Sequence, residues 1–293
     1  MDCNLCPRAC GVDRQERRGY CRSYDTMSIG LVSRHMWEEP PISGERGSGT
    51  IFFSGCNLGC VYCQNYSLSR GDIGREVTPA GLADIFRMLD DSGVHNINLV
   101  TASHYIGGLM RALDIYRPRL PLVFNCGGYE SLSQVRALAD IVDIWLPDFK
   151  YGDAALAERL SNAPDYPLIA REAIKLMRSY RPHDEYDGKI MTSGMIVRHM
   201  VLPNHIDNSV AALDIIKDAV GSDTVISLMS QYYPCGEASK YPDISRSLKP
   251  LEYKLALSHA SKLGFGDVFV QELSSADGEY TPDFNGYLGE RGV

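Results

Sequence analysis

The regular alternation of short apolar segments with amphipathic segments is the feature that most constrains how this chain can fold. It begins at residue 50 and continues to about residue 270. The apolar segments have the length of strands, and the amphipathic ones have the length of about 10–15 residues expected of helices in βαβ units. Strands are predicted over residues 50–55, 96–101, 121–125, 141–148, 194–203, 224–231 and 268–273, and helices over 78–93, 105–117, 131–140, 152–161, 168–179, 206–221 and 250–263.

This order of elements favours a parallel sheet covered by helices. The predicted strands are apolar on both faces, as strands in a covered parallel sheet are. About six βαβ units follow one another without a G-x-G-x-x-G turn, so a dinucleotide-binding sheet is not favoured. The fold class is therefore predicted to be α/β, with a partial, about six-stranded parallel β/α barrel over residues 48–293.

The predicted helix over residues 78–93 carries the clearest local signals. Thr78 is suited to the N-cap, Pro79 to the first helical position and Gly93 to the end of the helix. Its apolar residues recur at helical spacing and predict a buried stripe made of Leu82, Ile85, Phe86 and Leu89.

The first 47 residues are rich in cysteine and arginine and predict a small metal-binding leader, residues 1–47, ahead of the barrel. Four cysteines follow the pattern C-x2-C-x3-C-x10-C: Cys3, Cys6, Cys10 and Cys21. Tetrathiolate coordination suits either zinc or an auxiliary [4Fe–4S] cluster. The site is either a staple for a terminus too small to fold alone, or an electron conduit or substrate-ordering site.

Composition and charge argue against several function classes. The net charge of −8 argues against a general nucleic-acid or anionic-membrane binder. No apolar run reaches the roughly 18–20 residues that span a bilayer, and MDCNLCPRACG lacks the apolar core of a signal peptide. We therefore expect a cytoplasmic protein. In a reducing compartment its nine cysteines, seven of them clustered, indicate metal binding or catalysis rather than disulfides.

Polar residues gather at the predicted carboxyl ends of the strands, where barrels place their functional sites. Because these ends meet at one mouth, their side chains are expected to lie close together. They include Thr101, Ser103 and His104, then Asn125 and Cys126, then Asp148 and Lys150, then Arg198 and His199, and last Ser230 and Gln231.

Three cysteines in CNLGCVYCQN, directly after the first predicted strand, give this mouth its chemistry. Cys56, Cys60 and Cys63 have the spacing C-x3-C-x2-C. A closed structural zinc site takes four ligands, usually as two separated pairs. Three thiols in one loop suit three irons of a [4Fe–4S] cube and leave the fourth iron open to a substrate or cosubstrate. The alternative is a zinc site with three cysteines and a distant histidine.

The cysteine triplet at the end of the first barrel strand resembles the signature of the radical S-adenosylmethionine (SAM) superfamily. The resemblance covers about residues 48–272, and Tyr62 matches the aromatic residue usual before the last cysteine. It implies that Cys56, Cys60 and Cys63 hold a [4Fe–4S] cluster and that SAM binds the fourth iron. Reductive cleavage of SAM would then give a 5′-deoxyadenosyl radical that abstracts hydrogen from a substrate.

Within the superfamily the chain looks similar to the branch related to the pyruvate formate-lyase activating enzyme. LPDFKYGD, IVRHMVLPNH and NCGGYE resemble three SAM-contacting segments of that branch. The resemblance implies SAM contacts from Asp148, Lys150, Arg198 and Asn125, although Arg198 and Asp148 also suit a structural ion pair. NLVTASHYIGG lacks the Gly-Gly-Glu segment of that branch, so Thr101, Ser103 or a backbone carbonyl is expected to receive the amino group of SAM.

These features predict a radical SAM oxidoreductase that acts on a protein or peptide, as glycyl-radical activating enzymes do. An electron donor of the flavodoxin or ferredoxin type is the expected partner, and neither a membrane nor a nucleic acid is expected as one. One alternative is a radical SAM enzyme acting on a small molecule. The alternative from another class is a non-catalytic zinc-binding module.

Overall fold

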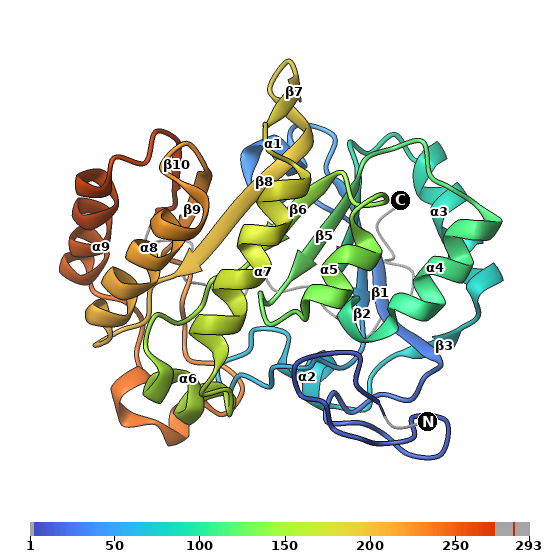
Figure 1. Ribbon diagram of the computed structural model, residues 1–293, viewed down its shortest axis with the longest axis horizontal. Helices are drawn as coiled ribbons and strands as arrows, with labels where there is room; N and C mark the ends of the chain where they lie inside the picture. Colours follow the sequence, from blue (N-terminus) through green and yellow to red (C-terminus); the bar gives the residue numbers. More distant parts are fainter. Residues whose placement is uncertain (1–2, 273–283, 285–293) are drawn as a thin grey trace.

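A ten-stranded, largely parallel sheet forms the centre of the molecule (Figure 1). The structure, a computed structural model, describes residues 3–272 and residue 284. The strands lie in the order β10-β9-β8-β6-β5-β4-β2-β1-β3, and β7 pairs with β8. Their bounds are β1 Met27–His35, β2 Ser48–Phe53, β3 Arg75–Val77, β4 Ile97–Val100, β5 Leu122–Cys126, β6 Ile144–Pro147, β7 Glu185–Asp187, β8 Ile190–Met200, β9 Val225–Met229 and β10 Val268–Val270.

The predicted α/β partial barrel is confirmed. Each of the seven predicted strands has a counterpart, from β2 to β10, and these seven pair in parallel with their neighbours. The curved sheet is open, since its order runs from β10 at one edge to β3 at the other. Strand β1 was not predicted, and it pairs antiparallel with β2 and β3. It lies before residue 48, where the sequence placed the start of the barrel domain, and that division stays a prediction.

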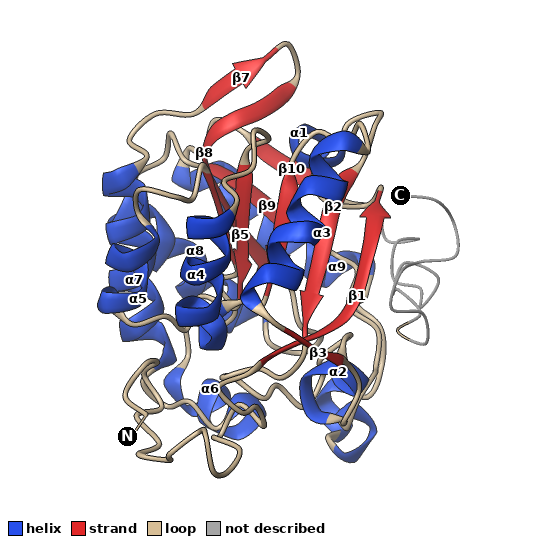
Figure 2. Ribbon diagram, turned by 90° about the vertical axis from the view of Figure 1, so that its right-hand side faces the viewer, coloured by secondary structure: helices blue, strands red, loops and turns tan. Residues whose placement is uncertain are grey.

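Helices cover the convex outer face of the sheet (Figure 2). The main ones follow the predicted segments closely, and α9 begins and ends at the predicted residues. Their bounds are α1 Pro40–Ser43, α2 Tyr66–Arg70, α3 Pro79–Asp91, α4 Ile106–Ile115, α5 Leu132–Leu138, α6 Ala154–Ser161, α7 Tyr166–Tyr180, α8 Ile206–Val220 and α9 Pro250–Leu263, with short 3₁₀ turns at Ser103–Tyr105, Ala238–Lys240 and Pro242–Ile244.

Helix α3 shows how local sequence fixes these elements. The Thr78 hydroxyl accepts a hydrogen bond from the Gly81 amide at 3.1 Å, which satisfies one of the free amides of the first turn. The predicted apolar stripe is buried, since Leu82, Phe86 and Leu89 have no solvent-exposed surface and Ile85 has little. Burial of this face anchors the helix to the outer side of the sheet.

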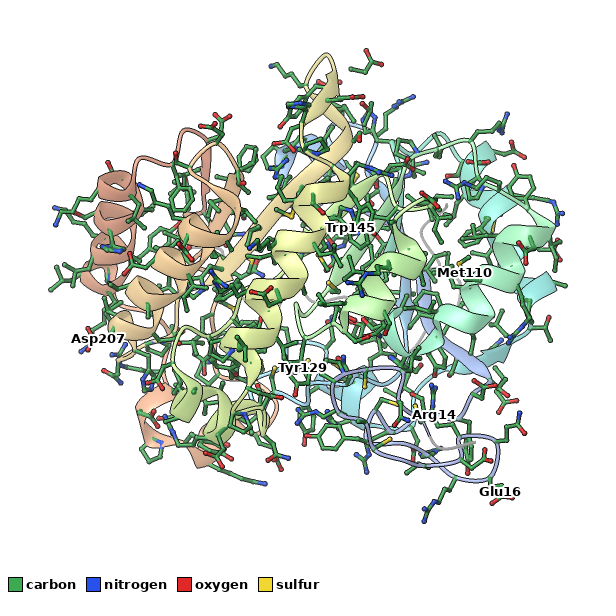
Figure 3. All side chains as sticks on the ribbon, in the orientation of Figure 1. Arg14, Glu16, Met110, Tyr129, Trp145 and Asp207 are labelled. Atoms are coloured by element: carbon green, nitrogen blue, oxygen red, sulfur yellow. The ribbon has the colours of Figure 1, made fainter. Side chains whose placement is uncertain are left out.

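Two apolar cores lie on opposite faces of the strands because alternate side chains point to opposite sides. Phe124 and Trp145 join the large outer core under the helices, and Figure 3 shows Trp145 at the centre of the molecule. Val123 and Ile144 point the other way, into the lumen of the barrel, and pack there with Ile42 of α1. Ile42 is fully buried, so α1 plugs the amino end of the lumen.

None of the helices within residues 3–272 has both the length and the apolar character needed to cross a membrane. All nine cysteines lie in the described part of the chain, and each is a free thiol. No disulfide joins any two of them.

Candidate functional site

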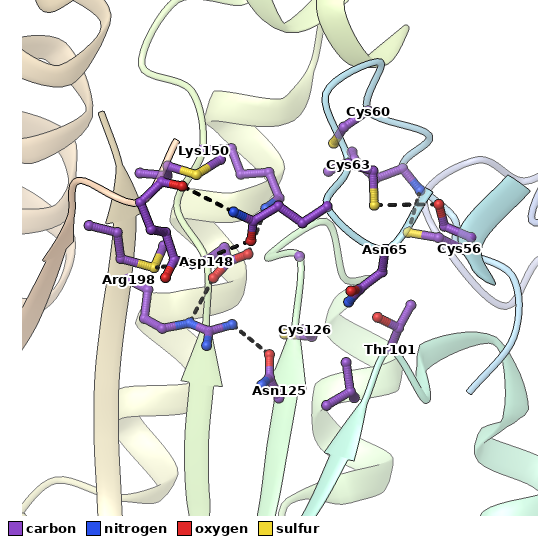
Figure 4. Close-up of a pocket in the computed structure, with 18 of the residues that line it drawn as sticks. Cys56, Cys60, Cys63, Asn65, Thr101, Asn125, Cys126, Asp148, Lys150 and Arg198 are labelled. Carbon is purple, nitrogen blue, oxygen red and sulfur yellow. Dashed lines mark hydrogen bonds and ion pairs between the residues drawn. The ribbon is translucent and has the colours of Figure 1, made fainter. Parts of the chain in front are cut away.

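A cavity of about 390 Å³ opens inside the barrel, and Figure 4 shows the part of it between the cysteine triplet and Arg198. It brings together nine of the site residues predicted from sequence, and Cys126 with them. The predicted residues lining it are Cys56, Cys60, Tyr62, Cys63, Thr101, Asn125, Asp148, Lys150 and Arg198. The expected convergence of strand-end residues is therefore observed for most of the set.

The three thiols of the triplet each accept one hydrogen bond from the protein. The Leu58 amide donates to Cys56 Sγ at 3.4 Å. Hydroxyl groups donate to the other two thiols. Ser161 Oγ lies 3.0 Å from Cys60 Sγ, and Ser69 Oγ lies 3.4 Å from Cys63 Sγ. Hydrogen bonds of this kind stabilise negative charge on sulfur, as a thiolate bound to iron requires.

Burial raises the pKa of Cys60 and raises that of Cys63 to about 12. Both are therefore neutral thiols until a metal replaces the proton. Among residues 3–272 and 284, no three His, Cys, Asp or Glu side chains converge to hold one metal ion. A [4Fe–4S] cube does not require such convergence, since each cysteine binds a different iron. The three hydrogen-bonded thiols at one end of an open cavity fit this group.

Next to the thiols, Lys150, Asp148 and Arg198 form a linked ion network. Lys150 Nζ lies 2.6 Å from Asp148 Oδ2, and Arg198 Nε lies 2.8 Å from Asp148 Oδ1. Burial by itself would raise the pKa of Asp148, but the two cations outweigh it and lower the pKa. The ion pair between Arg198 and Asp148 that the sequence suggested is thus present, and both side chains still face the cavity (Figure 4).

Glu38 extends this network and was missed in the sequence. It lies in the turn between β1 and α1, and its Oε2 is 2.9 Å from Arg198 Nη1. Its Oε1 accepts hydrogen bonds from Asn98 and Asn125, at 3.0 and 3.1 Å. Glu39 is beside it, with Oε2 3.9 Å from Arg198 Nη1. The sequence offered only two acids before a proline pair, a pattern that normally marks an exposed turn.

Thr101 and Ser103, the two candidates for the amino group of SAM, lie in different surroundings. Thr101 lines the cavity and has a φ of 61°, an uncommon conformation for a β-branched residue. Ser103 is buried outside the cavity lining and donates to Glu130 Oε1 at 2.6 Å. Of the two hydroxyl groups, only that of Thr101 faces the site.

The leader packs against the cysteine triplet. The Cys56 amide donates to the Cys21 carbonyl at 3.1 Å, which joins the two cysteine clusters through one hydrogen bond. Arg8 donates to the carbonyls of Asn57 and Leu58, each at 2.8 Å. Its guanidinium also lies 5.0 Å from the centre of the Tyr129 ring, which Figure 3 shows above the leader. The leader and the triplet loop therefore form one continuous structure.

Two buried histidines near the mouth have structural partners. His199 contacts the Phe149 carbonyl at 2.6 Å and Ser209 Oγ at 2.9 Å. His104 Nε2 lies 2.8 Å from the Ser54 carbonyl. Burial lowers the pKa of both, to about 4 for His199 and about 3 for His104, so each stays neutral.

Comparison with known proteins decides the family. The sequence model described as the Radical SAM superfamily matches residues 50–227, which include the triplet and the strand ends discussed above except Ser230 and Gln231. The chain belongs to the radical SAM superfamily. Membership implies a [4Fe–4S] cluster and bound SAM, and radical SAM enzymes need an electron donor. The thiols and the cavity described above suit both groups.

Two relatives show the range of similarity. The uncharacterized protein MJ0674 of Methanocaldococcus jannaschii is 30% identical over 271 residues, which cover 89% of this chain and 75% of that protein. The crystal structure of Streptococcus suis SuiB bound to SAM has a TM-score of 0.51 and 12% identity, and the match covers 76% of this chain and 50% of SuiB. The chain thus spans about half the length of SuiB, and the likeness shows the fold alone.

Proposed function

We propose that this radical SAM protein cleaves SAM reductively and uses the resulting 5′-deoxyadenosyl radical to abstract hydrogen from a substrate. The observation that carries the proposal is the shared cavity, in which the three thiols and the Lys150–Asp148–Arg198 network face one another. The chemistry that the bound cluster supplies is the transfer of one electron to SAM. The chain supplies binding, orientation and exclusion of water.

The cavity residues would share this work by their chemistry. Cys56, Cys60 and Cys63 would hold the cluster as thiolates, with Tyr62 closing the wall behind them. Asp148 and Lys150 present one acceptor and one donor to SAM from the end of β6. The guanidinium of Arg198 is held by its partners in a fixed orientation, which suits recognition of a polar ligand without rearrangement.

Two substrate classes remain candidates, and each has one supporting observation. A protein or peptide substrate, as for an activating enzyme, is supported by the fold shared with SuiB, of which one structure contains a precursor peptide, SuiA, at a TM-score of 0.51. A small molecule is supported by the lumen itself, since Glu38 and Glu39 line the same cavity as the three thiols.

We also propose that the leader holds a second metal, as zinc or as a [4Fe–4S] cluster. Zinc would require its thiols to move closer together, since no three of them converge on one point among the described residues. Burial raises the pKa of Cys10, but backbone hydrogen bonds from Tyr20 and Val12 and the Cys3 thiol outweigh it and lower the pKa. A Cβ atom placed on Gly19 would lie 3.4 Å from Cys21 Sγ and 3.5 Å from Cys10 Sγ, so these two sulfurs face the same point.

Burial raises the pKa of Cys21 and raises that of Cys6 to about 11, so these two thiols stay neutral until a metal replaces the proton. The proposal therefore rests on the shared direction of the Cys10 and Cys21 sulfurs and on the four-cysteine spacing.

The test is to assay 5′-deoxyadenosine from anaerobically reconstituted protein supplied with SAM and dithionite, after counting iron, sulfide and zinc. Cys60→Ala is expected to abolish the product, because the cluster loses one of three ligands. Cys235→Ala is the matched control, since its thiol donates to the Tyr62 carbonyl at 3.2 Å but lies outside the triplet. A colourless, zinc-loaded wild-type protein without product would contradict the proposal and support a zinc-binding module.

A further inference from the structure

We propose that Arg8 is a positioning residue for the triplet, and that it sets the reduction potential of the bound cluster through the hydrogen bonds on Cys56 and Cys60. The inference rests on the proposed function, because it concerns the electron that starts the reductive cleavage of SAM. In that step the [4Fe–4S] cluster takes up one electron and passes from the 2+ to the 1+ state. The electron comes from the donor protein, or from dithionite in vitro.

The guanidinium of Arg8 reaches four backbone carbonyls in two distant parts of the chain. In the triplet loop, Nε donates to Asn57 at 2.8 Å and Nη2 donates to Leu58 at 2.8 Å. At the carboxyl end of α6, Nη2 also donates to the Ser161 carbonyl at 2.8 Å, and Nη1 donates to that of Asn162. Four of the five N–H groups are thus in use, and one side chain of the leader joins the triplet loop to α6.

The first link to a thiol runs through a single peptide unit. The Asn57 carbonyl and the Leu58 amide belong to the same peptide bond, and the Leu58 amide donates to Cys56 Sγ at 3.4 Å. A cation bound to the carbonyl oxygen draws electron density from the peptide, so the N–H group of the same unit becomes a stronger donor. Arg8 therefore acts on Cys56 through this peptide.

The second link runs through Ser161. Its carbonyl accepts from Arg8, and its hydroxyl lies 3.0 Å from Cys60 Sγ and 2.6 Å from the Tyr151 hydroxyl. Because Ser161 and Cys60 are both buried, bulk water would not replace a hydroxyl that moved away. By holding the backbone at the end of α6, Arg8 keeps this hydroxyl within hydrogen-bonding distance of Cys60.

The guanidinium is itself held in place by aromatic rings and by the leader. It lies 4.1 Å from the centre of the Tyr20 ring and 5.0 Å from that of Tyr129, which are distances of cation–π contacts. Arg8 also lies between Cys6 and Cys10 in the sequence, so a metal bound in the leader would restrict its backbone. The hydrogen bonds on the triplet thereby depend on a segment that precedes the barrel.

These contacts affect the reduction potential through charge. Reduction adds one negative charge to the cluster and its sulfur ligands, and hydrogen bonds to those sulfurs stabilise that charge. Donors that are weakened or misplaced therefore lower the potential. The third thiol, Cys63, takes its hydrogen bond from Ser69 of α2 at 3.4 Å, outside the Arg8 contacts given above, and so provides an internal reference.

The experiment is a redox titration of the reconstituted protein without SAM, followed by the electron paramagnetic resonance signal of the reduced cluster. Arg8→Ala is expected to lower the equilibrium constant for reduction about tenfold, which is about 59 mV for a one-electron couple. Arg8→Lys keeps the charge, but an ammonium group cannot bridge four carbonyls, so a loss of about threefold should remain. A wild-type potential in either variant would overturn the proposal.

The matched control is Arg17→Ala, which removes an exposed arginine of the leader. It should change the equilibrium constant by less than about twofold, because solvent and salt screen an exposed charge. An equal shift in Arg17→Ala would show that the position of the arginine does not matter, and it would overturn the proposal. Iron, sulfide and zinc are counted in each variant, and if Arg8→Ala does not hold its metals, Arg8→Lys decides alone.

A double-mutant cycle tests the route. Ser161→Ala and Ser69→Ala each remove one hydroxyl donor, from Cys60 and Cys63 respectively, and each should lower the potential. Combined with Arg8→Lys, the effect of Ser161→Ala should fall to about half, because its hydrogen bond is already weakened, whereas Ser69→Ala should keep its full effect. Full additivity of both pairs would overturn the proposal, because Arg8 would then act independently of Ser161.

The potential is measured without SAM, so the two proposals can fail separately. If the potential shifts as expected but wild-type protein forms no 5′-deoxyadenosine, the role of Arg8 stands and the proposed function fails. If 5′-deoxyadenosine forms and an Arg8 variant keeps the wild-type potential, the proposed function stands and the role of Arg8 fails. A wild-type protein that assembles no cluster would contradict both.

Discussion

The guanidinium of Arg198 directs its donors to three acceptors from three parts of the chain. Nε donates a hydrogen bond to Asp148 and Nη1 donates one to Glu38. Nη2 donates to the side-chain oxygen of Asn125 at 2.6 Å. A lysine ammonium could not satisfy acceptors spread over a plane in this way. The side chain thereby fixes the positions of two carboxylates that would otherwise repel each other in a cavity shielded from water.

The buried carboxyl group of Glu130 gives a prediction for pH dependence. Burial raises its pKa from 4.5 to about 8, although Ser103 donates to it. Between these two values the folded state binds more protons than the unfolded state, so the free energy of unfolding falls as the pH rises. From pH 5 to pH 8.5 we expect Glu130 to account for a loss of roughly 3–5 kcal/mol, measured by urea unfolding.

The matched variant is Glu130→Gln, which keeps the shape and the hydrogen bond from Ser103. It should remove most of this pH dependence and be more stable than the wild type at pH 8.5. If the two proteins lose the same stability over this range, Glu130 is ionised in the folded state and the assignment is wrong.

At the scale of elements, the turn after β5 depends on Gly128. Its φ is +78°, and a Cβ atom there would lie 2.1 Å from the Asp148 carbonyl oxygen at the end of β6. We expect Gly128→Ala to lower the free energy of unfolding by roughly 2–4 kcal/mol, because both strain and a backbone clash arise. It should also weaken SAM binding, since Asp148 moves, as measured by equilibrium dialysis.

The neighbouring glycine provides the control for stability. A Cβ atom on Gly127 would meet Leu58 at 3.5 Å and Lys150 at 3.8 Å, which are ordinary contacts. Gly127→Ala should therefore change stability by less than about 1 kcal/mol. Equal destabilisation by the two substitutions would show that the turn tolerates no side chain at either position, and the argument from φ would be wrong.

The helices and parallel strands were predictable because each carries its own period of apolar residues. The helix α9 and the stripe of α3 follow directly from such patterns. Strand β1 did not stand out, because it lies among cysteine- and arginine-rich segments and pairs antiparallel at the side of the sheet. The position of β1 in the sheet depends on its tertiary pairing with β2, and no local sequence pattern predicts that pairing.

The site was only partly predictable for a related reason. The triplet and the strand-end residues Asp148, Lys150 and Arg198 follow from spacing and strand order. Glu38 and Glu39 precede the barrel, and their burial depends on a cation 160 positions later in the chain. A local sequence pattern predicts that acids such as Glu38 and Glu39 are exposed, because most acids are. It does not predict a distant partner, here Arg198, that allows them to be buried.

At the scale of the whole molecule, the leader and the barrel are expected to respond together to loss of metal. Cys21 and Arg8 bond directly to the triplet loop, so metal removed from either cluster should loosen both. After chelation of the reconstituted protein, we expect faster hydrogen exchange in residues 3–25 and 56–65. The amides of β5 and β6, which lie in the sheet core, should keep their protection.

The control is the Cys21→Ala variant, in which the leader loses one ligand while the triplet keeps all three. Exchange in residues 56–65 should then be faster even with the triplet loaded. An effect confined to residues 3–25 would show that the leader is an independent staple, without influence on the radical SAM site.

Glu38 and Glu39, which line the cavity from the turn after β1, have a consequence for the order of folding. Glu38 and Glu39 leave the ribosome long before residue 198 is synthesised, and neither can be buried cheaply without that arginine. We therefore expect the turn to stay exposed to water until β8 has joined the sheet. The contact between Glu38 and Arg198 joins residues 160 positions apart, and contacts of such high sequence separation form slowly. We therefore expect entry of the turn into the lumen to be among the last steps of folding, so that the cavity forms only when nearly the whole barrel is in place.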